Sequence, residues 1–97
     1  MNFQPSLFVQ ENEQGLDLQV DLPGVAREDL DIKVENDTVV LRAERKQRPT
    51  AKYARAFVLP DYIDQAGIQA KIVDGVLNLT LPRKEAAKPK TIPITVN

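Results

Sequence analysis

Few side chains in this 97-residue chain could carry out catalysis. The chain contains no histidine, the usual general base near neutral pH, and no cysteine that could serve as a thiolate nucleophile. Ser6 is the only serine, and no imidazole is present to activate it. Catalysis would have to rest on carboxylates, Lys, Tyr or hydroxyls, and no nucleophile–base pair can be recognised among them. We predict that the protein is not an enzyme.

Cofactor and metal sites are equally hard to find. The four glycines are isolated, and none begins a phosphate-binding G-x-x-x-x-G-K-[ST] loop or a G-x-G-x-x-G loop. The acidic cluster of Glu28, Asp29 and Asp31 could attract a hard cation, but it lacks the alternating acids and the glycine of calcium-binding loops. We interpret it as the solvated beginning of a strand, and we predict no cofactor and no metal.

Basic residues gather between Arg42 and Arg55, where Tyr53 could stack on a nucleic-acid base. The net charge of −1 provides no general attraction for a polyanion, and such a run around a Gln/Pro/Thr loop is typical of a solvated turn. We therefore predict no nucleic-acid partner. No apolar run has the length of a membrane span, and the first residues contain no basic and then apolar leader. We predict a cytoplasmic protein with no membrane partner.

The strongest functional candidate is the apolar segment from Thr91 to Ile94. In an extended backbone, Ile92 and Ile94 project to the same side. Pro93 fixes its own φ and lacks an N–H, so this segment cannot be a central strand. A charged and proline-containing run, residues 83–90, precedes it. Two aligned isoleucines on such a tether suggest docking in an apolar groove, with an edge strand folded onto its own domain as the alternative.

The elements that must position these residues are β-strands, because apolar and polar residues alternate with a period of two. Asp74-Gly75 has the chemistry of a two-residue hairpin turn, and Leu22-Pro23-Gly24 has the order of a type II turn. Residues 61–70 are predicted to form a turn or a single helical turn. The length suits one domain with a small core. Together these features predict an all-β antiparallel β-sandwich.

Several motifs occur in an order that resembles the alpha-crystallin domain of small heat-shock proteins. The resemblance extends from about Pro5 to the C-terminal end. It implies an immunoglobulin-like β-sandwich of about seven strands over residues 1–82 and a flexible C-terminal extension over residues 83–97. The motifs are the segments 21–25, 28–30, 53–60 and 70–77, followed by Ile92-Pro93-Ile94, which matches the I-x-I motif of the family.

The resemblance also implies a function, the ATP-independent holding of partly unfolded client proteins so that they do not aggregate. Self-association would use Ile92, Pro93 and Ile94, docked in a groove between two strands at one edge of the sandwich. Arg55 would lie near a subunit contact, with a solvent-facing strand residue as the alternative. The groove residues implied by the family are Leu30, Ile32, Val34, Leu77 and Leu79, some of which will be ordinary core because alternation does not reveal which face stays open.

Two departures from the family pattern affect assembly. Members usually begin with a long apolar N-terminal arm, whereas the domain pattern here starts by Pro5, so we expect a minimal or trimmed member. The loop over residues 46–52 spans at most about 25 Å when extended, and Pro49 interrupts strand pairing. We therefore predict that the strand-swapped dimer of bacterial and plant relatives is absent.

Two other functions stay open. A co-chaperone adaptor resembling the CS-domain proteins would share the sandwich and dock on a larger chaperone, although Ile92-Pro93-Ile94 argues against it. A structural subunit would use the same motif only to assemble with a longer paralogue.

Overall fold

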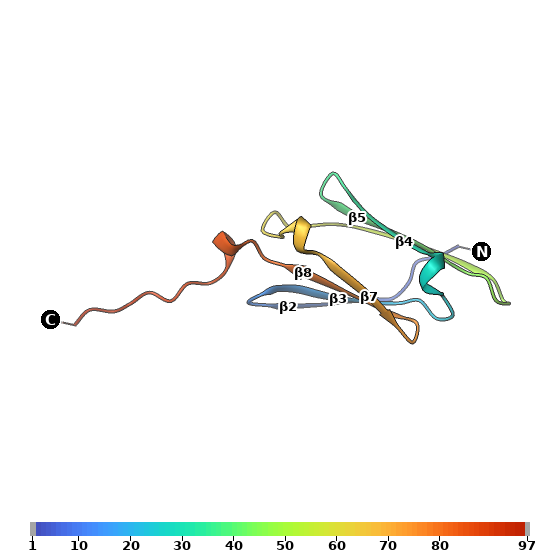
Figure 1. Cartoon of the computed structure of the whole chain (residues 1–97), viewed down its shortest axis with the longest axis horizontal. Coiled ribbons are helices and arrows are strands. Elements are labelled where there is room, and N and C mark those ends of the chain that lie inside the picture. The colour runs from blue at the N-terminus through green and yellow to red at the C-terminus, as the bar shows by residue number, and fades with distance from the viewer. Residues whose placement is uncertain (1, 97) are drawn as a thin grey trace.

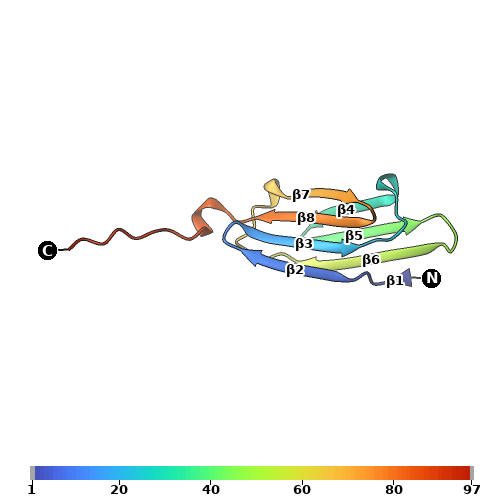
Figure 2. The ribbon, with the colours of Figure 1, turned by 90° about the horizontal axis from the view of Figure 1, so that it is seen from below.

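The computed structural model describes residues 2–96, which form two four-stranded β-sheets packed face to face (Figures 1 and 2). Neighbouring strands are antiparallel except for β1 and β6, which are parallel. The predicted immunoglobulin-like sandwich is confirmed, with seven strands of five or more residues and the two-residue β1. One sheet has the order β1 (Asn2–Phe3), β6 (Ala51–Val58), β5 (Thr38–Arg45), β4 (Leu30–Glu35), and the other β2 (Leu7–Asn12), β3 (Gly15–Asp21), β8 (Val76–Pro82), β7 (Gln69–Val73).

Two-residue turns set the register of two hairpins. The β4–β5 turn contains Asn36 with φ 50° and Asp37 with φ 61°, and the β7–β8 turn contains Asp74 with φ 51° and Gly75 with φ 76°. Positive φ at both central residues defines the type I′ turn, whose twist matches that of the flanking strands. The strand residues that flank each turn pair with each other, so every further pair along the hairpin is fixed.

The other predicted local features are also present. Gly24 has φ 77°, and the N–H of Val25 donates to the carbonyl of Leu22 at 3.1 Å, as a type II turn requires. The stretch 61–70 contains one 3₁₀ turn, η2 (Gln65–Gly67), which the Asp64 side chain caps by accepting from the backbone N–H of Ala66 at 3.2 Å. Two further 3₁₀ turns are η1 (Arg27–Asp29) and η3 (Glu85–Ala87).

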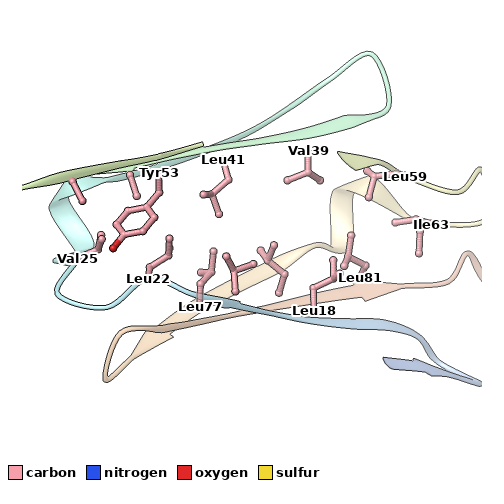
Figure 3. Packing of buried hydrophobic residues seen from close by; sticks show 14 residues of the cluster. Leu18, Leu22, Val25, Val39, Leu41, Tyr53, Leu59, Ile63, Leu77 and Leu81 are labelled. Atoms are coloured by element: carbon pink, nitrogen blue, oxygen red, sulfur yellow. The ribbon is translucent and has the colours of Figure 1, made fainter. Parts of the chain in front are cut away.

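The hydrophobic core lies between the two sheets (Figure 3). Leu41 of β5 and Leu77 of β8 face each other across this layer and are almost fully buried. In the described part of the chain, no polar or charged residue is buried with them. The core residues are Leu18, Val20, Leu22, Val25, Val39, Leu41, Ala43, Ala51, Tyr53, Leu59, Ile63, Leu77, Leu79 and Leu81.

Strand β6 begins earlier than alternation alone predicts. Ala51 pairs with Arg45 and is 2% exposed, so the β5–β6 connection is residues 46–50 and is shorter than the predicted loop. The backbone of β1 pairs with Lys52 and Tyr53 along the edge of β6 that faces away from β5. The absence of a strand-swapped dimer stays a prediction.

Candidate docking groove

A groove with aliphatic and basic lining residues runs between β4 and β7, which are each an edge strand of one of the two sheets. Each of these strands has a neighbour on one side only, β5 for β4 and β8 for β7. The cavity between them has a volume of about 470 Å³. Five of its lining residues are aliphatic and two are basic, so its surface is part apolar and part polar. The lining residues are Arg27, Leu30, Ile32, Ala70, Lys71, Ile72 and Leu77.

Three of the residues predicted for a groove line this cavity, namely Leu30, Ile32 and Leu77. Val34 lies on the same strand as Leu30 and Ile32, and its side chain is 38% exposed beyond the lining. Leu79 does not line the groove and is 1% exposed. Leu77 lies on the same central strand β8 and is equally buried, so both leucines belong to the core, and only Leu77 also borders the groove.

Sequence reasoning missed the second wall of the groove, Ala70 and Ile72 of β7. Their side chains face inward because they pair with Leu79 and Leu77, respectively. The sequence contained part of the information needed to find this wall, since the Asp74-Gly75 turn makes β7 and β8 the two arms of one hairpin. Both arms show apolar residues, and the sequence does not say which arm lies at the edge of the sheet.

The tail, residues 88–96, projects from the end of the sandwich at which β8 terminates (Figures 1 and 2). Ile92 is 81% exposed and Ile94 is 88% exposed, so neither side chain packs on its own domain. Residues 88–96 form no strand pair, and the edge-strand alternative is not realised in this structure. The groove and the Ile92-Pro93-Ile94 segment are therefore both open to solvent.

Arg83 fixes the point at which the chain leaves the sandwich. Its guanidinium carbon lies 4.2 Å from the centroid of the Tyr62 ring, and its Nη2 lies 2.7 Å from Oε1 of Glu11. The backbone N–H of Arg83 donates to the carbonyl of Gln14, and that of Lys84 donates to the carbonyl of Tyr62, both at 2.7 Å. The base of the tail is therefore attached to both β2 and the segment after β6.

Replacing Arg83 by methionine tests this attachment. Arg83→Met keeps an aliphatic stem but removes the cation–π contact and the ion pair, so we expect the free energy of unfolding to fall by about 1–2 kcal/mol. Amide hydrogen exchange at Lys84 should also accelerate, because its bond to the Tyr62 carbonyl becomes easier to open. Lys90→Met, at an exposed tail position, is the matched control and should change neither quantity. Unchanged exchange at Lys84 would contradict the proposed attachment.

Arg55 is half-buried and does not face solvent freely. It pairs with Leu41, a core residue, so its side chain lies on the inner face of the sheet. Its Nη1 donates to the carbonyl of Pro5 at 3.4 Å. This bond ties β6 to the segment before β2, and a role in a subunit contact stays a prediction.

Two residues of the acidic cluster, Asp29 and Asp31, form ion pairs with lysines. Oδ1 of Asp29 lies 2.8 Å from Nζ of Lys46, and Oδ2 of Asp31 lies 3.8 Å from Nζ of Lys33. The hydrogen bond to Asp29, followed by the negative charge of that carboxylate, raises the pKa of Lys46. Within residues 2–96, no group of three His, Cys, Asp or Glu side chains is placed to hold a metal ion. In the same range, no helix has the length and apolar character needed to cross a membrane.

Sequence comparisons agree with this architecture. The sequence model described as the Hsp20/alpha crystallin family matches residues 8–96. "18 kDa antigen 2" of Mycobacterium avium is 38% identical over 91 residues, which cover 82% of this chain and 66% of that protein. "Small heat shock protein C4" of Rickettsia felis is 28% identical over 104 residues, which cover 94% of this chain and 64% of that protein. The chain thus spans slightly less than two thirds of the length of these relatives.

Solved structures give the same answer for the fold. A small heat-shock protein from Xylella fastidiosa has a TM-score of 0.81 at 25% identity, covering 97% of this chain and 98% of that one. Heat shock protein 16.0 from Schizosaccharomyces pombe has a TM-score of 0.78 at 24% identity, covering 98% of this chain and 99% of that one. The resemblance drawn from the motifs is confirmed, and the chain belongs to the Hsp20/alpha crystallin family of small heat-shock proteins.

Proposed function

We propose that this protein is an ATP-independent chaperone that holds partly unfolded proteins and prevents their aggregation. The observation that carries the proposal is the open groove between β4 and β7, whose lining includes the aliphatic side chains of Leu30, Ile32 and Ile72. An extended apolar segment of an unfolding protein can lie in such a groove and is then unavailable for self-association. Membership of the family supports this reading.

The tail supplies a reversible cover for the groove. Ile92 and Ile94 of one copy would occupy the groove of a second copy, so assembly and client binding would compete for the same surface. Full burial of each isoleucine contributes about 1.5–3 kcal/mol before the cost of ordering the tail is subtracted. This range suits a contact that forms and breaks, and self-association through Ile92-Pro93-Ile94 is part of the proposal.

The direct test is light scattering from a model client that aggregates on heating, with the chain in molar excess and no ATP. We expect the wild-type chain to suppress aggregation. Ile32→Ser, which makes one wall of the groove polar, should suppress it less at a temperature where circular dichroism shows the variant folded. Val58→Ser is the matched control, because Val58 is 76% exposed on β6 and lies outside the groove.

The outcomes separate this function from its alternatives. No suppression by the wild-type chain, even in excess, would contradict the holding activity. An adaptor of the CS-domain type would instead retain one stoichiometric partner and leave the scattering unchanged. A structural subunit would suppress aggregation only when mixed with a longer paralogue.

A further inference from the structure

The outer edge of β4, which no strand within residues 2–96 covers, presents three alternate residues to which another strand could pair. Glu35 and Thr38 pair directly on either side of the two-residue β4–β5 turn, and in a type I′ hairpin this is a hydrogen-bonded pair. The backbone groups of Glu35, Lys33 and Asp31 therefore point toward β5. The backbone groups of Leu30, Ile32 and Val34 therefore point away from β5, to the open edge. Among the described residues, those of Ile32 and Val34 have no backbone partner there, and Leu30 donates its N–H to the carbonyl of Arg27 and keeps a free carbonyl.

The side chains of the same three residues lie on the inner face of the sheet, where Leu30 and Ile32 line the groove and Val34 lies just beyond its lining. Leu30, Ile32 and Val34 pair with Ala43, Leu41 and Val39, which all belong to the core, so the six side chains share the inner face of the sheet. A strand added at this edge can therefore satisfy free backbone groups and bury apolar side chains at the same positions.

The tail contains a third apolar residue in phase with the isoleucines. In an extended chain Val96 projects to the same side as Ile92 and Ile94, and its side chain is 87% exposed. The backbone groups of these three residues also point to one edge of the tail, because side-chain face and hydrogen-bonding edge alternate together along a strand. Pro93, which lacks an N–H, has its backbone on the opposite edge.

Only one direction of pairing satisfies these constraints. In an antiparallel pair, two directly opposed residues can exchange backbone hydrogen bonds while their side chains lie on the same face. In a parallel pair, residues whose backbones face each other have side chains on opposite faces. Placing the isoleucines in the groove would then turn the Pro93 backbone toward β4, where its missing N–H would leave the central position without a donor.

We propose that the tail of a second copy adds to β4 as an antiparallel strand, with Ile92 opposite Val34, Ile94 opposite Ile32 and Val96 opposite Leu30. Val96 is then a third anchor of the docked tail. This inference rests on the proposed function, since it concerns the same groove. Strand β7 is a poorer partner because only two of its side chains, Ala70 and Ile72, face this groove. The side chain of Ala70 is a single methyl group and offers little surface to bury.

The charges and the proline agree with this direction. The basic side of the tail, with Lys90, arrives at the β4–β5 turn, where Glu35 and Asp37 are exposed. The Pro93 backbone lies on the outer edge of the added strand, so that edge lacks a donor at its centre. A further strand cannot pair regularly there, which limits the growth of the sheet after one addition.

Cysteine cross-linking between copies of this chain tests the register, and its 97 residues contain no cysteine to interfere. In the proposed register Thr95 lies opposite Asp31 and Thr91 lies opposite Glu35, with Cα atoms about 4.5 Å apart, inside the range of disulfides. Asp31→Cys chains mixed with Thr95→Cys chains should give a disulfide-linked dimer under mild oxidation, as should Glu35→Cys with Thr91→Cys. The exchanged pairs, Asp31→Cys with Thr91→Cys and Glu35→Cys with Thr95→Cys, are displaced by about 13 Å and should stay unlinked.

The third anchor is tested by affinity. Val96→Ala should raise the dissociation constant of the assembly about tenfold in sedimentation velocity, because it removes a buried part of the side chain. Thr95→Ala, whose side chain faces solvent in this register, is the matched control and should leave the constant within about twofold.

The results distinguish this inference from the function on which it rests. Linkage of the exchanged pairs, no linkage of either matched pair, or a Val96→Ala variant that assembles like the wild type would overturn the antiparallel register with three anchors. If Ile92→Ala/Ile94→Ala still abolishes assembly in that case, tail docking survives and only its geometry is wrong. If that double variant assembles normally, the tail-docking proposal itself fails.

Discussion

Replacing Ile92 and Ile94 together by alanine is expected to dissociate the assembly while leaving the domain folded. Both side chains are more than four-fifths exposed in the single chain, so their removal costs the sandwich no packing. In the docked state the loss of buried aliphatic surface should weaken the contact by about 3 kcal/mol, or about 100-fold in the dissociation constant. Mass measurement in solution over a range of concentrations would show this shift, and thermal unfolding should keep the wild-type midpoint at a concentration where the wild type is itself dissociated.

A control for this variant is available within the tail. Thr91→Ala and Thr95→Ala change residues whose side chains lie on the opposite face of an extended tail from Ile92 and Ile94. These two variants should still assemble. Because the tail covers the groove in the proposal, the double isoleucine variant should also bind a partly unfolded client at least as well as the wild type. An unchanged mass together with lowered thermal stability would show instead that the motif docks on its own domain.

Leu41→Ala is expected to have the largest effect on folding. Leu41 is 0% exposed in the middle of β5 and packs between the sheets, so truncation leaves a cavity that the neighbouring side chains fill only in part. Such substitutions lower the free energy of unfolding by about 2–5 kcal/mol, a large share of the roughly 5–15 kcal/mol available to a domain of this kind. Urea denaturation followed by circular dichroism would measure the change.

Val58→Ala is the matched control for this substitution. Val58 lies on β6, the strand next to β5, but its side chain is 76% exposed, so the change in stability should stay within about 0.5 kcal/mol. A loss at Leu41 no larger than the loss at Val58 would contradict the placement of the core between the sheets. The comparison would also calibrate the groove variants, whose effects on assembly must be separated from effects on folding.

The sequence predicted the β-sandwich, several of its turns and the exposed apolar tail because these features depend on local chemistry. Alternation assigns each strand an inner and an outer face within a few residues, and Asp74-Gly75 closes its hairpin through its own tolerance of positive φ. The Ile92-Pro93-Ile94 segment could be recognised for the same reason, since Pro93 alone removes it from any central strand.

The site was predicted only in part, because its walls depend on which strands lie at the edges. Of the residues predicted for the groove, Leu30, Ile32 and Leu77 line the cavity between β4 and β7, whereas Leu79 is core and Ile72 is a lining residue that was not predicted. Apolar and polar residues alternate in the same way in an edge strand and in a central strand of this sandwich, so alternation cannot tell the two apart. The difference between β7 and β8 comes from β3, which pairs with β8 although about 60 residues separate them in sequence, a long-range contact that local pattern does not encode.

The sequence by itself therefore determined which residues face inward, where the chain turns and that an apolar segment follows a charged tether. Only the tertiary structure decided which inward-facing residues remain uncovered and which backbone groups remain free on β4. It also decided where the tail leaves the domain, since Arg83 reaches Glu11, 72 residues away in sequence. The physical reason is that the face to which a side chain points is set by the alternation within its own strand. Whether the edge of that strand stays open depends on which other strands pair with it, and those strands are distant in sequence.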